Sequence, residues 1–175
     1  RVLFVAAGRT RETRDVVTLA QAVLAGETHR HVGIVARAEV SPESQEAVAL
    51  IAQVEHIPNL LALKDRFEPV GVADPSAATR AHIERRFGVP VFESYEALLA
   101  AKPDAVLIAA PDAYHIEYAT RALSAGAHVF CEKPLGYGSA EIDGLIAARD
   151  AAGKVLQVGY MKRWDPSYEM LLEAT

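Results

Sequence analysis

The sequence predicts an α/β protein in which helices cover both faces of a mostly parallel sheet. Short apolar runs alternate along the chain with longer amphipathic segments, and the connections between them are only a few residues long. Such alternation is typical of βαβ units, whose right-handed crossovers place consecutive strands parallel in one sheet. Residues 105–110 contain no polar side chain, which indicates a central strand buried on both faces. A chain of 175 residues has the length of one such domain.

Composition limits the class of protein. Half of the residues, 51%, are hydrophobic, as expected of a globular domain with a sizeable core. The net charge of −5 and the scattered basic residues argue against a nucleic-acid binder. No apolar run has transmembrane length, and the first residues lack the apolar region of a signal peptide. The single cysteine, Cys131, excludes an internal disulfide and a cysteine-built metal site, so we expect a cytoplasmic protein without a metal.

The first part of the chain predicts one βαβ unit and a loop. Residues 2–7 and 32–36 are strand candidates, residues 13–24 form a helical pattern between them, and the polar residues 37–46 are a loop. A helix is expected over residues 47–54. Pro58 should kink or interrupt it, because proline lacks an N–H and disfavours helical geometry in the preceding residue, and residues 60–67 would resume it.

The remaining elements follow in regular order. Asp74 or Ser76 is expected to cap one helix and Ser94 the next, with Gly88 and Gly153 as helix stops. The predicted strands are residues 70–73, 91–92, 105–110, 127–131 and 155–159. The helix that Asp74 or Ser76 caps is predicted to end at Phe87, and the later helices to span residues 95–101, 113–124 and 139–152.

Polar turns follow several of these strands: Asp74, Pro111-Asp112, Glu132-Lys133 and Tyr160-Met161-Lys162. Since parallel strands end at the same edge of a sheet, these turns should meet where such folds bind ligands. Lys133 could there hold a substrate hydroxyl or handle a proton. The alternative, a solvated ion pair of Glu132 with Lys133, is less favoured because the other polar turns share the edge.

Several segments together resemble the Gfo/Idh/MocA oxidoreductases, which are NAD(P)-dependent dehydrogenases of sugars, inositols and related polyols. The matching segments are residues 52–61, 72–76, 109–115, 132–134 and 159–166. The resemblance implies a Rossmann-like dinucleotide-binding domain over residues 47–160. We expect the divergent segment before it, residues 1–46, to form a βαβ unit that joins the sheet. Residues 161–175 would begin the link to a second, α+β domain that is absent from this chain.

The resemblance also implies site residues. Asp74 would contact the adenosine ribose, and its carboxylate favours NAD over NADP because it would repel a 2′-phosphate; a plain helix cap is the alternative. Ala110, Pro111 and His115 match the turn against the cofactor, and Ala110 stands where the family more often has Thr.

The next matching segment is the family's catalytic signature. Glu132, Lys133 and Pro134 match it, and the resemblance implies that Lys133 lies beside the reacting carbon and that the bond before the proline is a candidate for cis. Tyr160, Lys162 and Arg163 match the family segment that leads toward the substrate.

Two departures from the family remain. The phosphate-binding glycines are missing: residues 47–50 read Ala-Val-Ala-Leu, and no glycine occurs between Gly33 and Gly71. Residues 32–36, or else 2–7, would supply the first strand. The second departure is that nothing in this chain matches the family's second domain. The family's proton-transfer histidine lies in that domain, so we expect this chain alone to be inactive. The alternative function is a degenerate Rossmann-like module with a structural or regulatory role. The apolar residues of the last segment, 167–174, would then be exposed or covered in a homo-oligomer.

Overall fold

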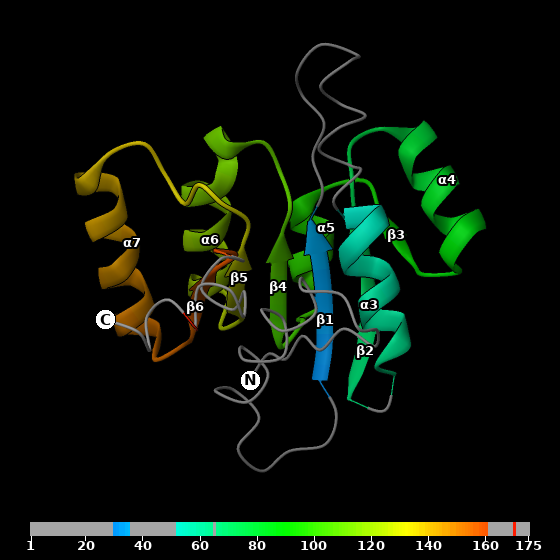
Figure 1. Cartoon of the computed structure of the whole chain (residues 1–175), viewed down its shortest axis with the longest axis horizontal. Helices are drawn as coiled ribbons and strands as arrows, with labels where there is room; N and C mark the ends of the chain where they lie inside the picture. The colour runs from blue at the N-terminus through cyan, green and yellow to red at the C-terminus, as the bar shows by residue number, and fades with distance from the viewer. Residues whose placement is uncertain (1–29, 36–51, 65, 161–169, 171–175) are drawn as a thin grey trace.

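The computed structural model describes residues 30–35, 52–64, 66–160 and 170, and it contains one six-stranded sheet (Figure 1). The strands lie in the order β3-β2-β1-β4-β5-β6, and every neighbouring pair is parallel. They are β1 (Arg30–Val35), β2 (Phe67–Ala73), β3 (Val91–Phe92), β4 (Ala105–Ile108), β5 (His128–Cys131) and β6 (Leu156–Val158). The predicted doubly wound α/β fold is confirmed.

Strand β1 occupies the centre of the sheet. It pairs with β2 on one side and β4 on the other, with Ile34 opposite Val72 and Leu107. The strand predicted at residues 32–36 is therefore confirmed as part of the sheet. The alternative strand 2–7, the helix 13–24 and the loop 37–46 lie outside the described residues. The strand order reverses between β1 and β4, and ligands bind at such a switch point in open α/β sheets.

Helices form a layer on each face of the sheet (Figure 1). The described helices are α3 (Ile57–Ala62), α4 (Ala77–Phe87), α5 (Tyr95–Ala100), α6 (His115–Ser124) and α7 (Ser139–Ala152), with a π-helical turn at Ala52–His56 and a 3-10 turn at Asp112–Tyr114. Side chains of β4 alternate between two cores, as expected of a pleated strand. Ala105 and Leu107 pack in the core that contains α3 and α4, whereas Val106 and Ile108 pack in the core of α5, α6 and α7.

The region around Pro58 differs from the prediction. The chain is helical without interruption from Ala52 to Ala62, because a π-helical turn directly precedes Pro58, which lies in the first turn of α3. A proline ring clashes with the carbonyl four residues earlier in an α-helix, and the wider turn relieves that clash. The predicted extension of this helix to residue 67 is wrong: Phe67 is buried and begins β2.

Strand β2 carries an irregularity that requires glycine. Its register against β1 shifts between Val32 and Gly33, which face Pro69 and Gly71. Gly71 has a φ of +152°, and a Cβ there would lie 2.6 Å from the Pro90 carbonyl oxygen. The absence of a side chain at Gly71 therefore lets β2 approach the segment that leads into β3.

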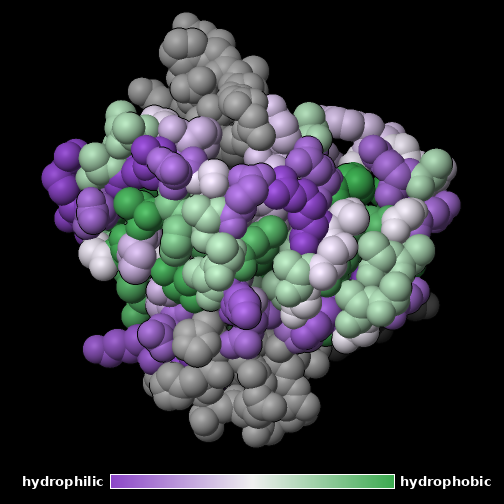
Figure 2. Space-filling view, turned by 180° about the vertical axis from the view of Figure 1, so that it is seen from behind, coloured by the Kyte–Doolittle hydropathy of each residue, from purple (hydrophilic) through white to green (hydrophobic). Residues whose placement is uncertain are grey.

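Polar residues spread over the outer surface, with apolar residues between them (Figure 2). None of the helices in the described part of the chain is long and apolar enough to cross a membrane.

Candidate functional site

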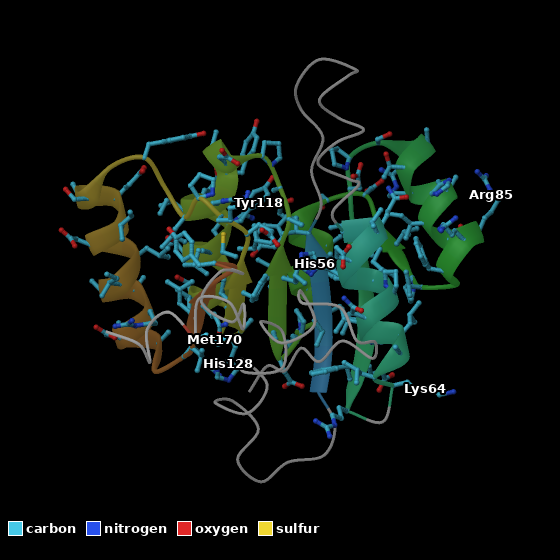
Figure 3. The ribbon with its side chains drawn as sticks, viewed as in Figure 1. His56, Lys64, Arg85, Tyr118, His128 and Met170 are labelled. Carbon is cyan, nitrogen blue, oxygen red and sulfur yellow. The ribbon has the colours of Figure 1, made fainter. Side chains whose placement is uncertain are left out.

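The buried polar side chains of the described residues lie at one edge of the sheet. They are His56, Asp74 and His115, which are 4%, 1% and 1% exposed. Asp74 follows β2, His115 begins α6 after the β4 turn, and His56 ends the π-helical turn before α3 (Figure 3). Titratable side chains are seldom buried unless they are paired or functional, so this edge is the candidate site.

Asp74 keeps one carboxylate oxygen available. Its Oδ1 accepts a hydrogen bond of 2.7 Å from the Ser76 N–H, while Oδ2 is buried without a hydrogen-bond partner among the described residues. The hydroxyl of Ser76, not Asp74, caps α4 by accepting from the Thr79 N–H at 3.3 Å. Burial raises the pKa of Asp74 from 3.8 to about 6. The carboxylate therefore has the capacity for one further donor.

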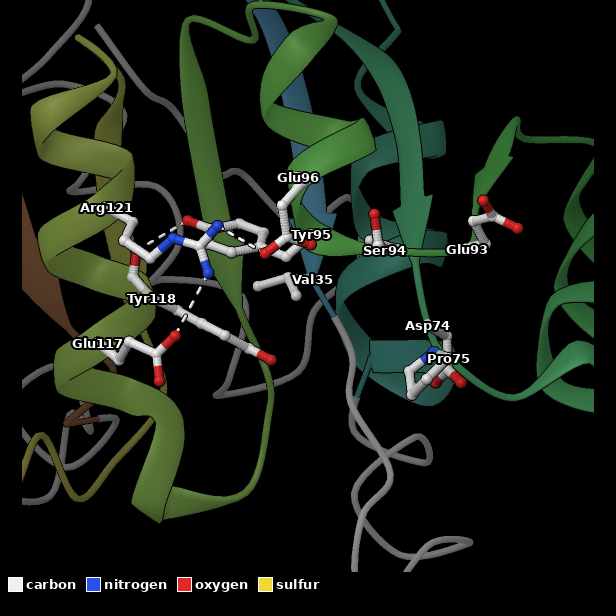
Figure 4. Close-up of a pocket in the computed structure, with 11 residues that line it drawn as sticks. Val35, Asp74, Pro75, Glu93, Ser94, Tyr95, Glu96, Glu117, Tyr118 and Arg121 are labelled. Carbon is white, nitrogen blue, oxygen red and sulfur yellow. Dashed lines mark hydrogen bonds and ion pairs between the residues drawn. The ribbon is translucent and has the colours of Figure 1, made fainter.

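Beside Asp74 lies an open hollow of about 280 Å³, between α5 and α6 (Figure 4). The ends of β1 and β2, the β3–α5 connection and one face of α6 line it. The lining residues are Val35, Ala73, Asp74, Pro75, Glu93, Ser94, Tyr95, Glu96, Glu117, Tyr118 and Arg121. An apolar and aromatic wall with polar groups at its rim is the usual composition of a small-molecule site.

Two tyrosines form the aromatic wall. The Tyr95 hydroxyl donates to the Tyr118 carbonyl oxygen at 2.7 Å, and the two ring centroids are 4.5 Å apart. Burial raises the pKa of Tyr95. The Arg121 guanidinium lies 5.2 Å from the Tyr95 ring and pairs with Glu96 at 2.6 Å. The sequence analysis missed these residues, because Tyr95 and Tyr118 are 23 positions apart and no local pattern links them.

The Glu132-Lys133-Pro134 turn directly follows β5. Lys133 is exposed, and its side chain makes no hydrogen bond or ion pair with the residues that the structure describes. Glu132 Oε1 lies 2.9 Å from His56 Nε2, and Glu132 Oε2 accepts the Lys133 N–H at 3.3 Å. Burial would raise the pKa of Glu132, but the His56 hydrogen bond and charge outweigh it and the pKa is lowered. An ionised carboxylate therefore directly precedes the exposed Lys133 in the chain.

His115 is buried against this turn. Its Nδ1 is 2.6 Å from the Pro134 carbonyl oxygen, and its Nε2 is 2.8 Å from the Ala110 carbonyl oxygen. The Lys133–Pro134 bond is cis, as the resemblance implied. Pro111 precedes the 3-10 turn that leads into α6. Thus Ala110, Pro111, His115 and the lysine turn are brought together at the ends of β4 and β5.

The substrate-side residues are only partly described. Tyr160 follows β6 at the same edge and is 51% exposed. Lys162 and Arg163 lie outside the described residues, as does the segment 47–50 in which the phosphate-binding glycines were expected.

A doubly wound parallel sheet with a carboxylate after its second strand and a crevice at the switch point defines the class of dinucleotide-binding Rossmann domains. A model of the "Oxidoreductase family, NAD-binding Rossmann fold" (Gfo/Idh/MocA) matches residues 48–160. The chain belongs to this oxidoreductase family.

Similar proteins agree with this assignment. An inositol 2-dehydrogenase from Paracoccus denitrificans is 35% identical over 132 residues, which are 74% of this chain and 37% of that protein. A 3-ketoreductase from Actinomadura kijaniata, solved with NADP and TDP-benzene, superposes with a TM-score of 0.70 and 28% identity over 82% of this chain and 41% of its own. The WlbA dehydrogenase from Bordetella pertussis, solved with NADH and UDP-GlcNAcA, has a TM-score of 0.64 and 26% identity over 75% and 35%. The chain thus spans less than half the length of these relatives.

Proposed function

We propose that this chain is the nucleotide-binding portion of an NAD(P)-dependent oxidoreductase that interconverts a hydroxyl and a carbonyl of a sugar, an inositol or a related polyol. The observation that carries the proposal is the placement of Asp74 and Lys133 on one edge of a Rossmann sheet. The relatives, which include an inositol 2-dehydrogenase, favour this substrate class. A degenerate module without dinucleotide binding is not favoured, because the family model matches residues 48–160, which include Asp74 and Lys133.

The edge suits an extended dinucleotide. Asp74 and Lys133 follow β2 and β5, which are separated by β1 and β4. Three strand spacings correspond to about 14 Å along the edge. The available Asp74 oxygen fits a ribose hydroxyl, and the hollow beside it would take the adenosine. Ala110 and Pro111 would line the middle. Asp74 would also repel a 2′-phosphate, so NAD is preferred over NADP.

The cofactor, when bound, accepts or supplies the hydride. The exposed Lys133 amine would hydrogen-bond the substrate oxygen and assist its proton transfer, acting as a general acid or base. Glu132, whose carboxylate lies 2.9 Å from His56, would help to hold the turn that carries Lys133. Tyr160, Lys162 and Arg163 would face the substrate.

This chain alone should give no turnover, since the resemblance places a proton-transfer histidine in the second domain. The sequence has a single cysteine and therefore no internal disulfide, which suits a protein of the reducing cytoplasm. Self-association through the segment 167–174 stays a prediction.

Titration of the chain with NADH, followed through the single tryptophan, Trp164, tests the proposal. Saturable quenching in the micromolar range is expected, and no signal at millimolar NADH would refute cofactor binding. Lys133→Ala should retain NADH affinity, yet abolish turnover in a longer version that carries the substrate domain. Lys64→Ala is the matched control, because Lys64 is exposed at the opposite edge of the sheet (Figure 3). Equal loss of binding and turnover in Lys133→Ala would assign Lys133 a structural role.

A further inference from the structure

The turn that carries Lys133 is held from both faces of the sheet by a buried histidine. His56 belongs to the helical segment on the α3 face, where its ring meets Phe130 edge-on at 5.8 Å. His115 begins α6, which packs on the opposite face. One ring contacts the Glu132 side chain and the other contacts the Pro134 backbone, so Lys133 lies between two anchored neighbours.

The ring of His115 contacts two backbone carbonyl groups. Both of its ring nitrogens face carbonyl oxygens, those of Pro134 and Ala110, at 2.6 and 2.8 Å. A carbonyl oxygen can only accept, so a ring nitrogen that carries a hydrogen donates to the carbonyl that it faces. At 1% exposure, the ring has no further polar atom to offer a cofactor. It instead joins the end of β4 to the turn after β5.

Glu132, the residue before Lys133, is held by contacts on several sides. Its side chain meets His56 Nε2 at 2.9 Å, and its own N–H donates to the Ile108 carbonyl oxygen at 2.9 Å. A Cβ on Gly159 would lie 3.4 Å from both carboxylate oxygens, so the end of β6 closes in on the same group. His56 itself ends the π-helical turn, a feature frequent at functional sites.

We propose that His56 and His115 are positioning residues that aim Lys133 by clamping the residues on either side of it. The inference rests on the proposed function, in which Lys133 handles the substrate proton. Because the Lys133 side chain has no hydrogen-bond or ion-pair partner among the described residues, its direction depends on the backbone of the turn. The clamp fixes that backbone and leaves the amine exposed for the substrate.

Hydrogen exchange on the full 175-residue chain tests the clamp. His56→Phe and His115→Phe keep an aromatic ring and remove the hydrogen bonds, while His82→Phe, on the exposed surface of α4, is the matched control. Loss of a buried hydrogen bond should speed amide exchange in residues 131–138 by about tenfold. Exchange in β1 and β4 should stay unchanged. Unaltered exchange in the turn, or an equal rise across the sheet, would overturn the positioning role.

A measurement on the unaltered chain needs no variant to fold. A ring N–H of His115 should exchange slowly with solvent, and rapid exchange of that hydrogen would contradict the clamp. In a longer, active version, His56→Phe should lower kcat by about tenfold with KM little changed, as expected when an interaction is lost only in the transition state. His56→Gln, which restores a donor, should recover part of that loss; no recovery would contradict a hydrogen-bonding role.

NADH binding separates the two proposals. Wild-type chain that binds no NADH would refute the proposed function, whatever the exchange data. Normal NADH binding together with unaltered exchange in both histidine variants would refute the clamp alone.

Discussion

The buried Asp74 carboxylate should lower the free energy of unfolding at neutral pH, and the same carboxylate should bind the cofactor. Its pKa in the folded chain, about 6, lies above the ordinary value of 3.8, because the group is buried. The folded state therefore holds its proton more tightly than the unfolded chain does. The associated stability is fully present below pH 3.8 and is lost as the pH rises through about 6. A rise of this size corresponds to about 3 kcal/mol.

Asp74→Asn tests this reasoning. The amide keeps an oxygen for the Ser76 N–H and removes the buried charge, but its NH₂ group replaces Oδ2, which has no described partner. We therefore expect the variant to gain only about 1–2 kcal/mol at neutral pH, and to lose about 1–2 kcal/mol at about pH 4, where the charge is absent and the buried NH₂ group remains. Urea denaturation at both pH values measures the difference. Asp143→Asn, at an exposed position of α7, should show neither effect.

Cofactor binding supplies the second half of the test. Ribose hydroxyls would donate to the ionised carboxylate, so NADH affinity should rise with pH through about 6. Asp74→Asn should weaken NADH binding by about tenfold, since hydrogen bonds to charged groups contribute about 1.5–3 kcal/mol. It should also narrow the preference for NADH over NADPH. A variant less stable than the wild type at neutral pH, or an NADH affinity independent of pH, would refute the reasoning.

Two further substitutions test the packing around the site. Gly71→Ala should lower the free energy of unfolding by about 3 kcal/mol, because its Cβ would collide with the Pro90 carbonyl at a φ of +152°; a thermal melt within error of the wild type would contradict the bulge geometry. Tyr95→Phe removes only the hydroxyl that donates to the Tyr118 carbonyl, so we expect a loss of about 1 kcal/mol by chemical denaturation, with the ring and the hollow retained. An unchanged unfolding free energy would mean that this hydrogen bond is not formed.

Local chemistry predicted most of the secondary structure. Ser76 and Ser94 cap their helices through side-chain oxygens, and Gly88 and Gly153 end theirs in the left-handed conformation. These features depend on a few adjacent residues, so the sequence reveals them. The apolar run at 105–110 identified the central strand for the same reason. Pro58 was misread, because its effect on the helix depends on a π-helical turn that no propensity predicts.

The sequence by itself determined the alternation of strands and helices, the edge at which polar turns collect, and the family signature around Lys133. Only the tertiary structure decided what surrounds those residues. The pairing of His56 with Glu132 joins positions 76 apart, and the two carbonyls that hold His115 come from different turns. The available Oδ2 of Asp74 likewise follows from burial, not from its neighbours in sequence. Such contacts depend on how distant segments pack, and a period or a cap reports only on residues within a few positions.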